Sequence, residues 1–372
     1  MTRHTPAALA AGALLAAAAT AQAQSSVTIY GVADAALSIA NAGNGAPHQQ
    51  RLDSAVGQGS RLGFRGHEDL GDGLRALFTM EMGFSLGTGA FQQGGLPWGR
   101  QIFAGLGGRQ WSVTMGRQYS PSLLAVQAAD AFGQNYWGSS VGYGIGTLQS
   151  PGSAASAGAA CQGASARINN AVVGSYTAGG LTGRLMFGGG DQDARKTGRY
   201  LSPGFSYSNG PLMLTGAYAR MAQCAPEITA TASPAWQTEA TLGGSVDAGA
   251  ARLFAGYYLW DPSEDQRARP PTYLKQQAYW IGTRVRVGGT GTLIAQVARL
   301  QQKRAGADAT GTSLGLTYEH LLSKRTRVYV SAARMWNGDH ASFSLAATTV
   351  AQAANGAGAD PRVLSFGLTH AF

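Results

Sequence analysis

The segment VTIYGVADAALSI, residues 27 to 39, alternates between apolar and more polar positions. Side chains of a β-strand point in turn to opposite faces, so this period of two predicts a strand. Its polar face carries a single charge, that of Asp34. Its apolar face holds the odd positions Val27, Ile29, Gly31, Ala33, Ala35, Leu37 and Ile39.

The same alternation, divided by turn residues, recurs to the end of the chain and predicts sixteen strands. We place them at residues 27–40, 59–67, 74–84, 100–106, 110–118, 168–177, 181–190, 198–208, 211–221, 236–247, 250–260, 276–287, 290–301, 310–320, 325–336 and 361–372.

The connections between these strands alternate between long and short. For example, 41–58 and 85–99 are long, whereas the Asn-Gly pair at 209–210 is a strong signal for a tight hairpin turn. Short periplasmic turns and long extracellular loops are typical of bacterial outer-membrane barrels, which have an even number of strands. The sequence therefore predicts an all-β fold, a 16-stranded antiparallel transmembrane β-barrel.

In such a barrel the apolar phase faces lipid and the other phase faces a lumen, which sixteen strands make wide enough for water. We expect the even face of 27–39 to line this water-filled interior. Sorting the charges by phase assigns basic residues in excess to the lumen. The lumen-lining set is Arg61, Arg65, Arg75, Arg184, Arg252, Arg284 and Arg286, against Asp34, Glu81 and Glu319.

The first residues combine Arg3, an Ala-rich apolar run and an Ala-Gln-Ala site, the pattern of a secretory signal. We predict a signal peptide at 1–23 and one barrel domain at 24–372. No later window is long and apolar enough for a membrane helix. The two cysteines, Cys161 and Cys224, fall in predicted loops on one side of the barrel. The sequence leaves two alternatives, a disulfide between them or two unpaired thiols.

Six stretches of the sequence carry a resemblance to a known family. They are SSVTIYGVADA, SRLGFRGHEDLGDGLRALFTMEMGF, GRQYSP, RINNAVVGSY, LLSKRTRVYVSAA and GLTHAF. They resemble the trimeric general porins of Gram-negative bacteria, of the β-proteobacterial type. The resemblance implies a homotrimer in the outer membrane and a third long loop, here 119–167, that folds into the lumen as a constriction. The chain also ends on Phe372, which resembles the assembly signal that the barrel-assembly machinery recognises.

By this resemblance, the constriction arginines of the family correspond to Arg61, Arg117 and Arg167. Strand phase places Arg61 on the inner face, in agreement with this role. It places Arg117 on the outer face unless Gly116 forms a bulge that shifts the register. Asp130, the first acidic residue of the loop, either faces these arginines and creates a transverse field, or caps a short helix and anchors the loop.

The sequence offers little support for enzyme chemistry. HEDLG lacks the second histidine of a zinc motif, GQGSRLG has the wrong glycine spacing for a dinucleotide fingerprint, and no G-x-S-x-G elbow occurs. We expect no metal and no cofactor. The basic residues alternate into a barrel instead of forming a patch, which argues against nucleic acid, and the basic loop 266–275 suits anionic lipid and lipopolysaccharide headgroups or the pore mouth.

The chain has a formal net charge of +9. Rings of arginine favour anions in narrow pores, so the sequence predicts a passive diffusion channel for small hydrophilic solutes with a preference for small anions. One alternative is a substrate-specific channel for an anionic metabolite. Another is a barrel that acts as an adhesin or an enzyme.

Overall fold

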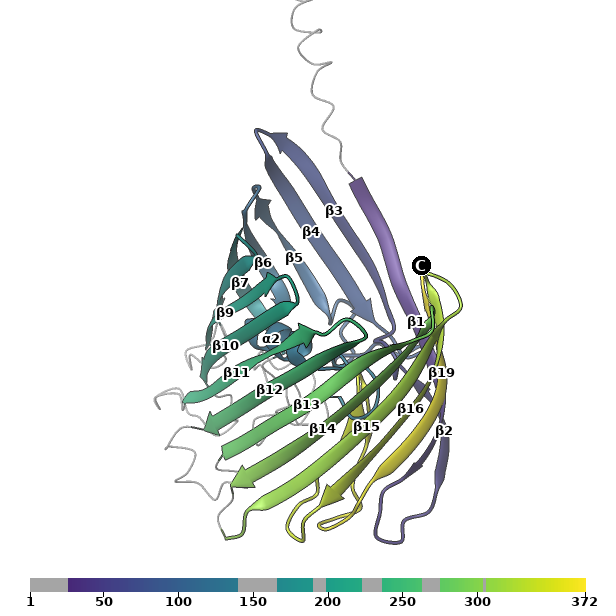
Figure 1. The fold of residues 1–372 in the computed structure, drawn as a ribbon. Helices are drawn as coiled ribbons and strands as arrows, with labels where there is room; N and C mark the ends of the chain where they lie inside the picture. Colours follow the sequence, from purple (N-terminus) through teal and green to yellow (C-terminus); the bar gives the residue numbers. More distant parts are fainter. Residues whose placement is uncertain (1–25, 140–165, 190–198, 223–235, 263–274, 304–305) are drawn as a thin grey trace, which may run out of the picture.

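The computed structural model describes residues 26–139, 166–189, 199–222, 236–262, 275–303 and 306–372. These residues form one closed antiparallel barrel (Figure 1). The ring closes where β1 (Ser26–Asn41) pairs with β19 (Arg362–Ala371). No helix in the described ranges is long and apolar enough to cross a membrane.

The barrel has sixteen strand positions, because β2 and β3 share the second one and both pair with β1. The other strands follow in chain order around the ring. Between β1 and β19 they are β2 (Gln49–Ser54), β3 (Arg61–Gly71), β4 (Leu74–Gly83), β5 (Gln101–Gly107), β6 (Trp111–Tyr119), β7 (Arg167–Ala178), β8 (Leu181–Gly189), β9 (Arg199–Asn209), β10 (Leu212–Ala222), β11 (Trp236–Asp247), β12 (Ala251–Pro262), β13 (Lys275–Val287), β14 (Gly291–Lys303), β15 (Ala309–Leu321) and β16 (Thr326–Asn337).

All sixteen predicted strands are confirmed. The largest shift is in β3, which continues to Gly71 and leaves only Asp72 and Gly73 in the turn that we predicted to be longer. Asp72 and Gly73 both adopt positive φ, as tight hairpin turns require. The predicted Asn-Gly turn is also present, with Gly210 at a φ of 55°.

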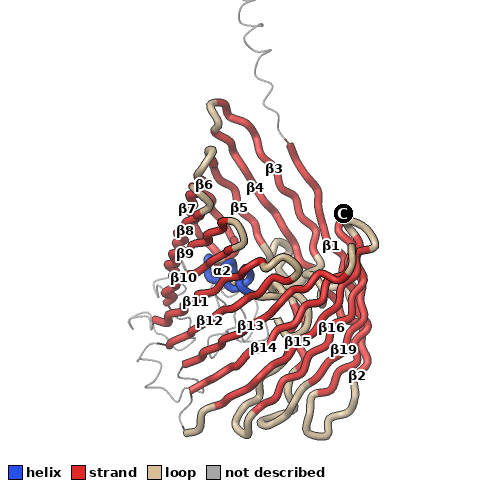
Figure 2. Tube along the Cα trace, viewed as in Figure 1, coloured by secondary structure: helices blue, strands red, loops and turns tan. Residues whose placement is uncertain are grey.

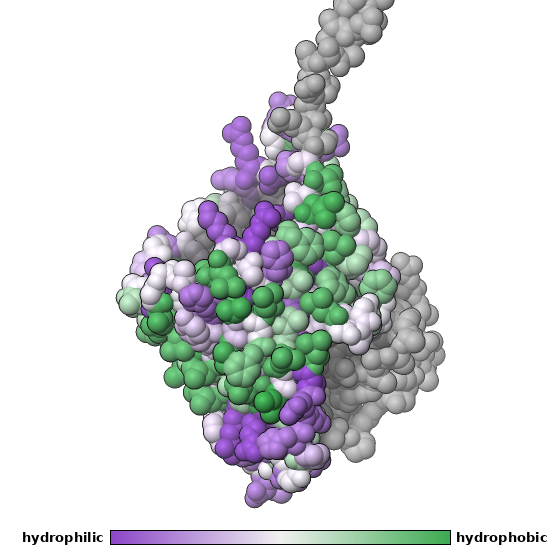
Figure 3. Space-filling model, turned by 90° about the vertical axis from the view of Figure 1, so that its right-hand side faces the viewer, coloured by the Kyte–Doolittle hydropathy of each residue, from purple (hydrophilic) through white to green (hydrophobic). Residues whose placement is uncertain are grey.

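The outer face of the barrel is apolar, as the alternation predicts. On β1, Val27, Ile29 and Leu37 are each more than 60% exposed, whereas Asp34 and Ser38 on the other face are buried. Figure 3 shows a band of hydrophobic side chains around the middle of the visible face, with hydrophilic ones toward both ends. This is the surface that a membrane-spanning barrel presents to lipid.

From Val32 to Ala40 the inner face of β1 is buried and does not line water, which corrects our expectation for this stretch. The carboxylate of Asp34 accepts hydrogen bonds from the backbone N–H of Gly57 at 3.0 Å and from the Tyr329 hydroxyl at 2.9 Å. These contacts hold residues 55–60, the segment between β2 and β3, against the inside of the wall. Small inner side chains on β1 therefore leave space for packed protein instead of an open lumen.

The loop after β6 enters the barrel, and its described part, 120–139, lies inside it (Figure 2). It begins with helix α2 (Pro121–Ala129), whose N-cap Ser120 accepts the backbone N–H of Leu123 at 3.1 Å. Pro121 at the first helical position suits this start, because its missing N–H would have no partner there. Further along, the indole N–H of Trp137 donates to the Ser365 hydroxyl on β19 at 2.7 Å.

Glycines on the wall make room for this loop. A Cβ atom on Gly243 would lie 2.5 Å from the Cβ of Ala129, and one on Gly282 would lie 2.6 Å from the Cβ of Ala131. Gly315 likewise approaches the carbonyl oxygen of Trp137. The inner wall is therefore shaped to seat the loop, and glycine is the residue that allows the closest approach.

A second inward-folded segment was not predicted. Between β16 and β19, residues 338–361 contain the small hairpin of β17 (Leu345–Ala347) and β18 (Val350–Gln352). Phe343 and Leu345 are buried in the same cluster as the loop after β6. The hairpin tip brings Thr348 close to Gly59, since a Cβ atom on Gly59 would lie 3.1 Å from the Thr348 methyl group.

Some predictions concern residues outside the described ranges. They are the signal peptide at 1–23, both cysteines (Cys161 and Cys224), most of the basic loop 266–275, and residues 140–165 of the loop 119–167.

Candidate functional site

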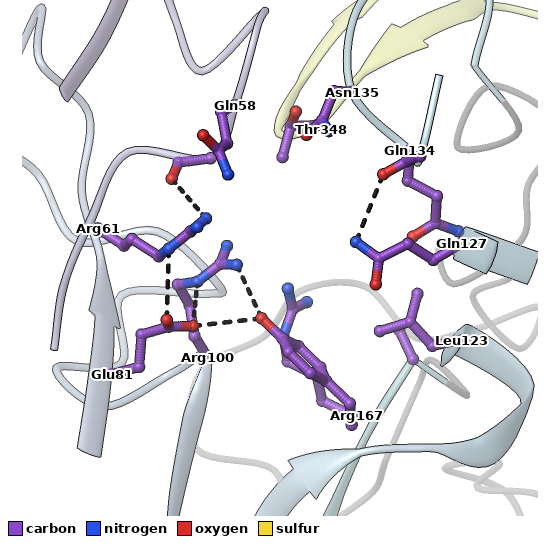
Figure 4. A pocket seen from close by; sticks show the side chains of 14 residues that line it. Gln58, Arg61, Glu81, Arg100, Leu123, Gln127, Gln134, Asn135, Arg167 and Thr348 are labelled. Atoms are coloured by element: carbon purple, nitrogen blue, oxygen red, sulfur yellow. Dashed lines mark hydrogen bonds and ion pairs between the residues drawn. The ribbon is translucent and has the colours of Figure 1, made fainter. Parts of the chain in front are cut away.

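A narrow space of about 250 Å³ lies inside the barrel, between the loop after β6 and the wall of β3 to β7. Figure 4 shows arginine side chains on the strand side and amide side chains on the loop side. We call this space the constriction. Its lining residues are Gln58, Gly59, Arg61, Glu81, Arg100, Tyr119, Leu123, Gln127, Gly133, Gln134, Asn135, Ala166, Arg167 and Thr348.

The strand side is organised around Glu81 on β4. Its carboxylate lies 2.7 Å from Nε of Arg100 and 3.4 Å from Nε of Arg61, and it accepts a hydrogen bond from the Tyr30 hydroxyl at 3.1 Å. Arg61 begins β3 and also donates to the carbonyl oxygen of Gly59 at 3.2 Å. One carboxylate thus holds two guanidinium groups at the edge of the constriction.

Arg100 is 7% exposed and donates to the Tyr119 hydroxyl at 2.7 Å. Burial lowers the pKa of the Arg100 guanidinium, but the neighbouring Tyr119 and Glu81 outweigh that effect and raise the pKa above its usual value. Arg100 is therefore positively charged at physiological pH.

Arg167 begins β7 and lies on the Tyr119 ring, with its guanidinium carbon 5.1 Å from the ring centroid. Its Nε atom is buried and has no hydrogen-bond partner. A buried guanidinium N–H without a partner costs free energy. Because Nε has almost no accessible surface, an anion in the constriction meets the charge of Arg167 and not this N–H.

The loop side of the constriction is polar but uncharged. Leu123 and Gln127 lie four residues apart on α2 and so share one helix face, and Gln127 donates to the carbonyl oxygen of Gly133 at 3.4 Å. Gln134 and Asn135 add further amides. The positive charge of the strand side is therefore not balanced across the gap.

Asp130 is not among the lining residues. It follows α2, is 1% exposed, and its carboxylate accepts the backbone N–H groups of Phe132 at 3.0 Å and Gln134 at 2.9 Å. This geometry agrees with the predicted alternative in which Asp130 anchors the loop. The transverse field expected from Asp130 has no support in this arrangement.

Arg117 is also not among the lining residues, although the groups that it bonds lie close to Arg100 and Arg167 in the chain. The register does shift between Gly116 and Gln118, but Arg117 pairs with Ile102, whose side chain is on the outer face. Its guanidinium donates to the carbonyl oxygen of Gly99 at 2.9 Å and to the side chain of Asn169. Arg117 therefore fixes the backbone beside the constriction.

Several other predicted lumen residues brace the loop or their own wall. Arg284 donates to the carbonyl oxygen of Ala131, and Glu319 accepts the Tyr136 hydroxyl at 2.7 Å. Burial and the Glu319 carboxylate raise the pKa of Tyr136, against the effect of Arg327, so the phenol stays protonated and donates. The remaining predicted arginines lie on the inner phase of their strands. They are Arg65 on β3, Arg75 on β4, Arg184 on β8, Arg252 on β12 and Arg286 on β13.

Sequence reasoning missed Arg100. Counting the alternation of β5 backwards from the exposed Ile102 puts Arg100 on the outer face, but β5 begins only at Gln101. The backbone before Gln101 therefore does not follow the strand period, and Arg100 turns inward to Glu81. The predicted strand at 100–106 included Arg100, so strand phase gave no signal for its inward position.

A closed sixteen-stranded barrel with an apolar outer band and a charged inner constriction defines a channel of the bacterial outer membrane. Comparison with known sequences agrees, since the Gram-negative porin model matches residues 8–340. This chain belongs to the Gram-negative porin family. It is a passive outer-membrane channel and not an enzyme.

Two relatives are similar over most of their length. Outer membrane porin protein 32 of Delftia acidovorans is 31% identical over 366 residues, covering 97% of this chain and 98% of the relative. An outer membrane porin protein of Bordetella pertussis is 28% identical, covering 86% of this chain and 91% of the relative. Among solved structures, the anion-selective porin from Comamonas acidovorans matches with a TM-score of 0.78 and 26% identity, covering 94% of this chain and all of that one.

Proposed function

We propose that the constriction gives this channel a preference for small anions. The observation that carries the proposal is the imbalance of charge across the constriction. Arg61, Arg100 and Arg167 face neutral amides, and Glu81 is the one acidic side chain among the described lining residues. The structural similarity to an anion-selective porin also supports a preference for anions.

The physical basis is the focused field of a narrow pore. Low-dielectric walls concentrate the potential of the arginines, which lowers the energy of an anion in the constriction and raises that of a cation. Two unit charges 4 Å apart in bulk water interact by about 1 kcal/mol, or about fivefold in an equilibrium. Salt screens this effect over about 8 Å at physiological ionic strength, so the preference is graded and not absolute.

The test compares ion selectivity before and after removal of charge from the constriction. The variant R61S/R167S should lose much of its preference for chloride over potassium, by about threefold or more, and should conduct better because the gap widens. R65S is the matched control, because Arg65 lies on the same inner face of β3 but outside the constriction. Unchanged selectivity in R61S/R167S would contradict the proposal.

We further infer how the chain is assembled. Cleavage after residue 23 would release the barrel to the periplasm, and the barrel-assembly machinery would recognise the terminal Phe372. The resemblance to trimeric porins supports a homotrimer. Light scattering of the detergent-solubilised protein tests this, and a monomeric mass would contradict it. Lipopolysaccharide would then surround the outer rim of the assembly.

A further inference from the structure

A second cavity of about 210 Å³ lies inside the barrel, on another side of α2 from the constriction. It is enclosed by α2 and by the wall of β8, β9 and β10. Arg184 is the fourth residue of β8, Thr215 is the fourth of β10, and Ser206 is the fourth from the end of β9. Ser206 pairs with Thr215, and Arg184 pairs with Gly204, two residues before Ser206, so the three lie on adjacent strands near the short turns. The lining is Pro121, Leu124, Ala125, Ala128, Arg184, Gly204, Phe205, Ser206 and Thr215.

Arg184 is the charged group of this cavity. It is partly buried, and in the described part of the chain its guanidinium has no hydrogen bond or ion pair. The other predicted lumen arginines mostly have partners, as Arg252 has in the Ser245 hydroxyl at 2.9 Å. A partly desolvated guanidinium without an acceptor favours binding of an anion. Ser206, the diagonal neighbour of Arg184 across the pair of β8 and β9, adds a hydroxyl donor to the lining.

The opposite wall of the cavity is apolar. Leu124 and Ala128 are four residues apart on α2, share one face, and remain partly exposed. The neighbouring face of the helix, with Leu123 and Gln127, lines the constriction instead. Helix α2 thus separates two different environments, one polar and one with an apolar wall facing a lone arginine.

We propose that this cavity is a second anion site, selective for small organic carboxylates with an apolar body. The carboxylate would bind the Arg184 guanidinium and the Ser206 hydroxyl, and the apolar part would pack on Leu124 and Ala128. Inorganic anions and acetate lack the group that the helix face accommodates. This site goes beyond the charge preference of the constriction, because it discriminates between anions.

The experiment measures the chloride conductance of the full-length refolded protein in a planar bilayer, with benzoate as the probe and acetate as the comparison. Benzoate should reduce the conductance in a saturable way at concentrations at which acetate has little effect. R184Q should raise the half-inhibiting benzoate concentration at least tenfold. R252Q is the matched control and should leave this concentration unchanged.

A second variant, A128F, fills the cavity from the helix side and should also abolish the benzoate effect, so the proposal does not depend on R184Q folding. Equal inhibition by acetate and benzoate would overturn the proposal, as would equal shifts in R184Q and R252Q. The selectivity of R61S/R167S tests the constriction separately. Failure of either proposal is therefore visible without the other.

Discussion

The guanidinium of Arg100 lies 2.7 Å from the carboxylate of Glu81, so the one acidic lining residue in the described chain is paired with a basic one. This pairing partly cancels the positive charge of the constriction. It also keeps two arginines, Arg61 and Arg100, in place. Glu81 is therefore both a structural anchor and the group that limits anion preference.

Replacing Glu81 by glutamine should increase the chloride-over-potassium permeability ratio about threefold, because one negative charge is removed while the amide still accepts hydrogen bonds. Reversal potentials in KCl gradients measure this ratio. The matched control is D69N, which removes a carboxylate from β3 near the short turn, outside the constriction. A fall in the ratio for E81Q would show that the pairing supports anion passage in another way.

The loop after β6 packs against glycines of the barrel wall, and the effect of replacing one of them can be measured. In Gly282→Val the new side chain would collide with Ala131, since even a Cβ atom would lie 2.6 Å from that residue. We expect overpacking to lower the free energy of unfolding by about 1–3 kcal/mol and to displace the loop, which raises conductance and weakens ion selectivity.

Gly183→Val is the control for this experiment, because Gly183 lies within β8 and has nothing within 4 Å of its virtual Cβ. Conductance and selectivity of G183V should match those of the unmodified protein. Wild-type conductance in G282V would mean that the loop does not depend on this glycine.

Closure of the barrel depends on a contact between its two ends. Gly31 and Phe372 exchange two backbone hydrogen bonds of 3.1 Å. A Cβ on Gly31 would collide with the Phe372 ring and would lie 2.7 Å from the carbonyl oxygen of Arg61. Gly31→Val should therefore destabilise the barrel by about 1–3 kcal/mol. The double variant G31V/F372A should recover at least about 1 kcal/mol of that loss, because the colliding ring is gone.

Urea unfolding followed by tryptophan fluorescence measures these free energies. Strict additivity of the two changes would contradict the contact between the ends of the chain.

Much of the fold was predictable because a strand in a membrane barrel is a local pattern. Alternation identified β1 and its outer face from thirteen residues alone. The packing inside the barrel was not predictable in this way. Trp137 bonds to Ser365 and Asp34 bonds to Tyr329, pairs that lie hundreds of residues apart in the chain. No local period encodes such contacts, so the inner face of β1 from Val32 onward was wrongly expected to line water.

In the candidate site, too, residues on strands were predictable and residues outside the strand pattern were not. Arg61 follows from strand phase and lines the constriction, whereas Arg100 lies just outside a strand, where phase no longer applies. Arg117 and Asp130 were assigned by resemblance and by order along the loop, and both hold backbone instead. Side chains beside bulges and in loops are positioned by tertiary contacts that the sequence pattern does not express.

The most direct test of the account is the zero-current potential of the refolded protein in a planar bilayer under a tenfold KCl gradient. Potassium and chloride have nearly equal mobilities in water, so the sign reports the pore itself. The arginine-lined constriction predicts that the dilute side becomes negative, because chloride crosses more readily than potassium. A potential of zero or of the opposite sign would contradict the central claim.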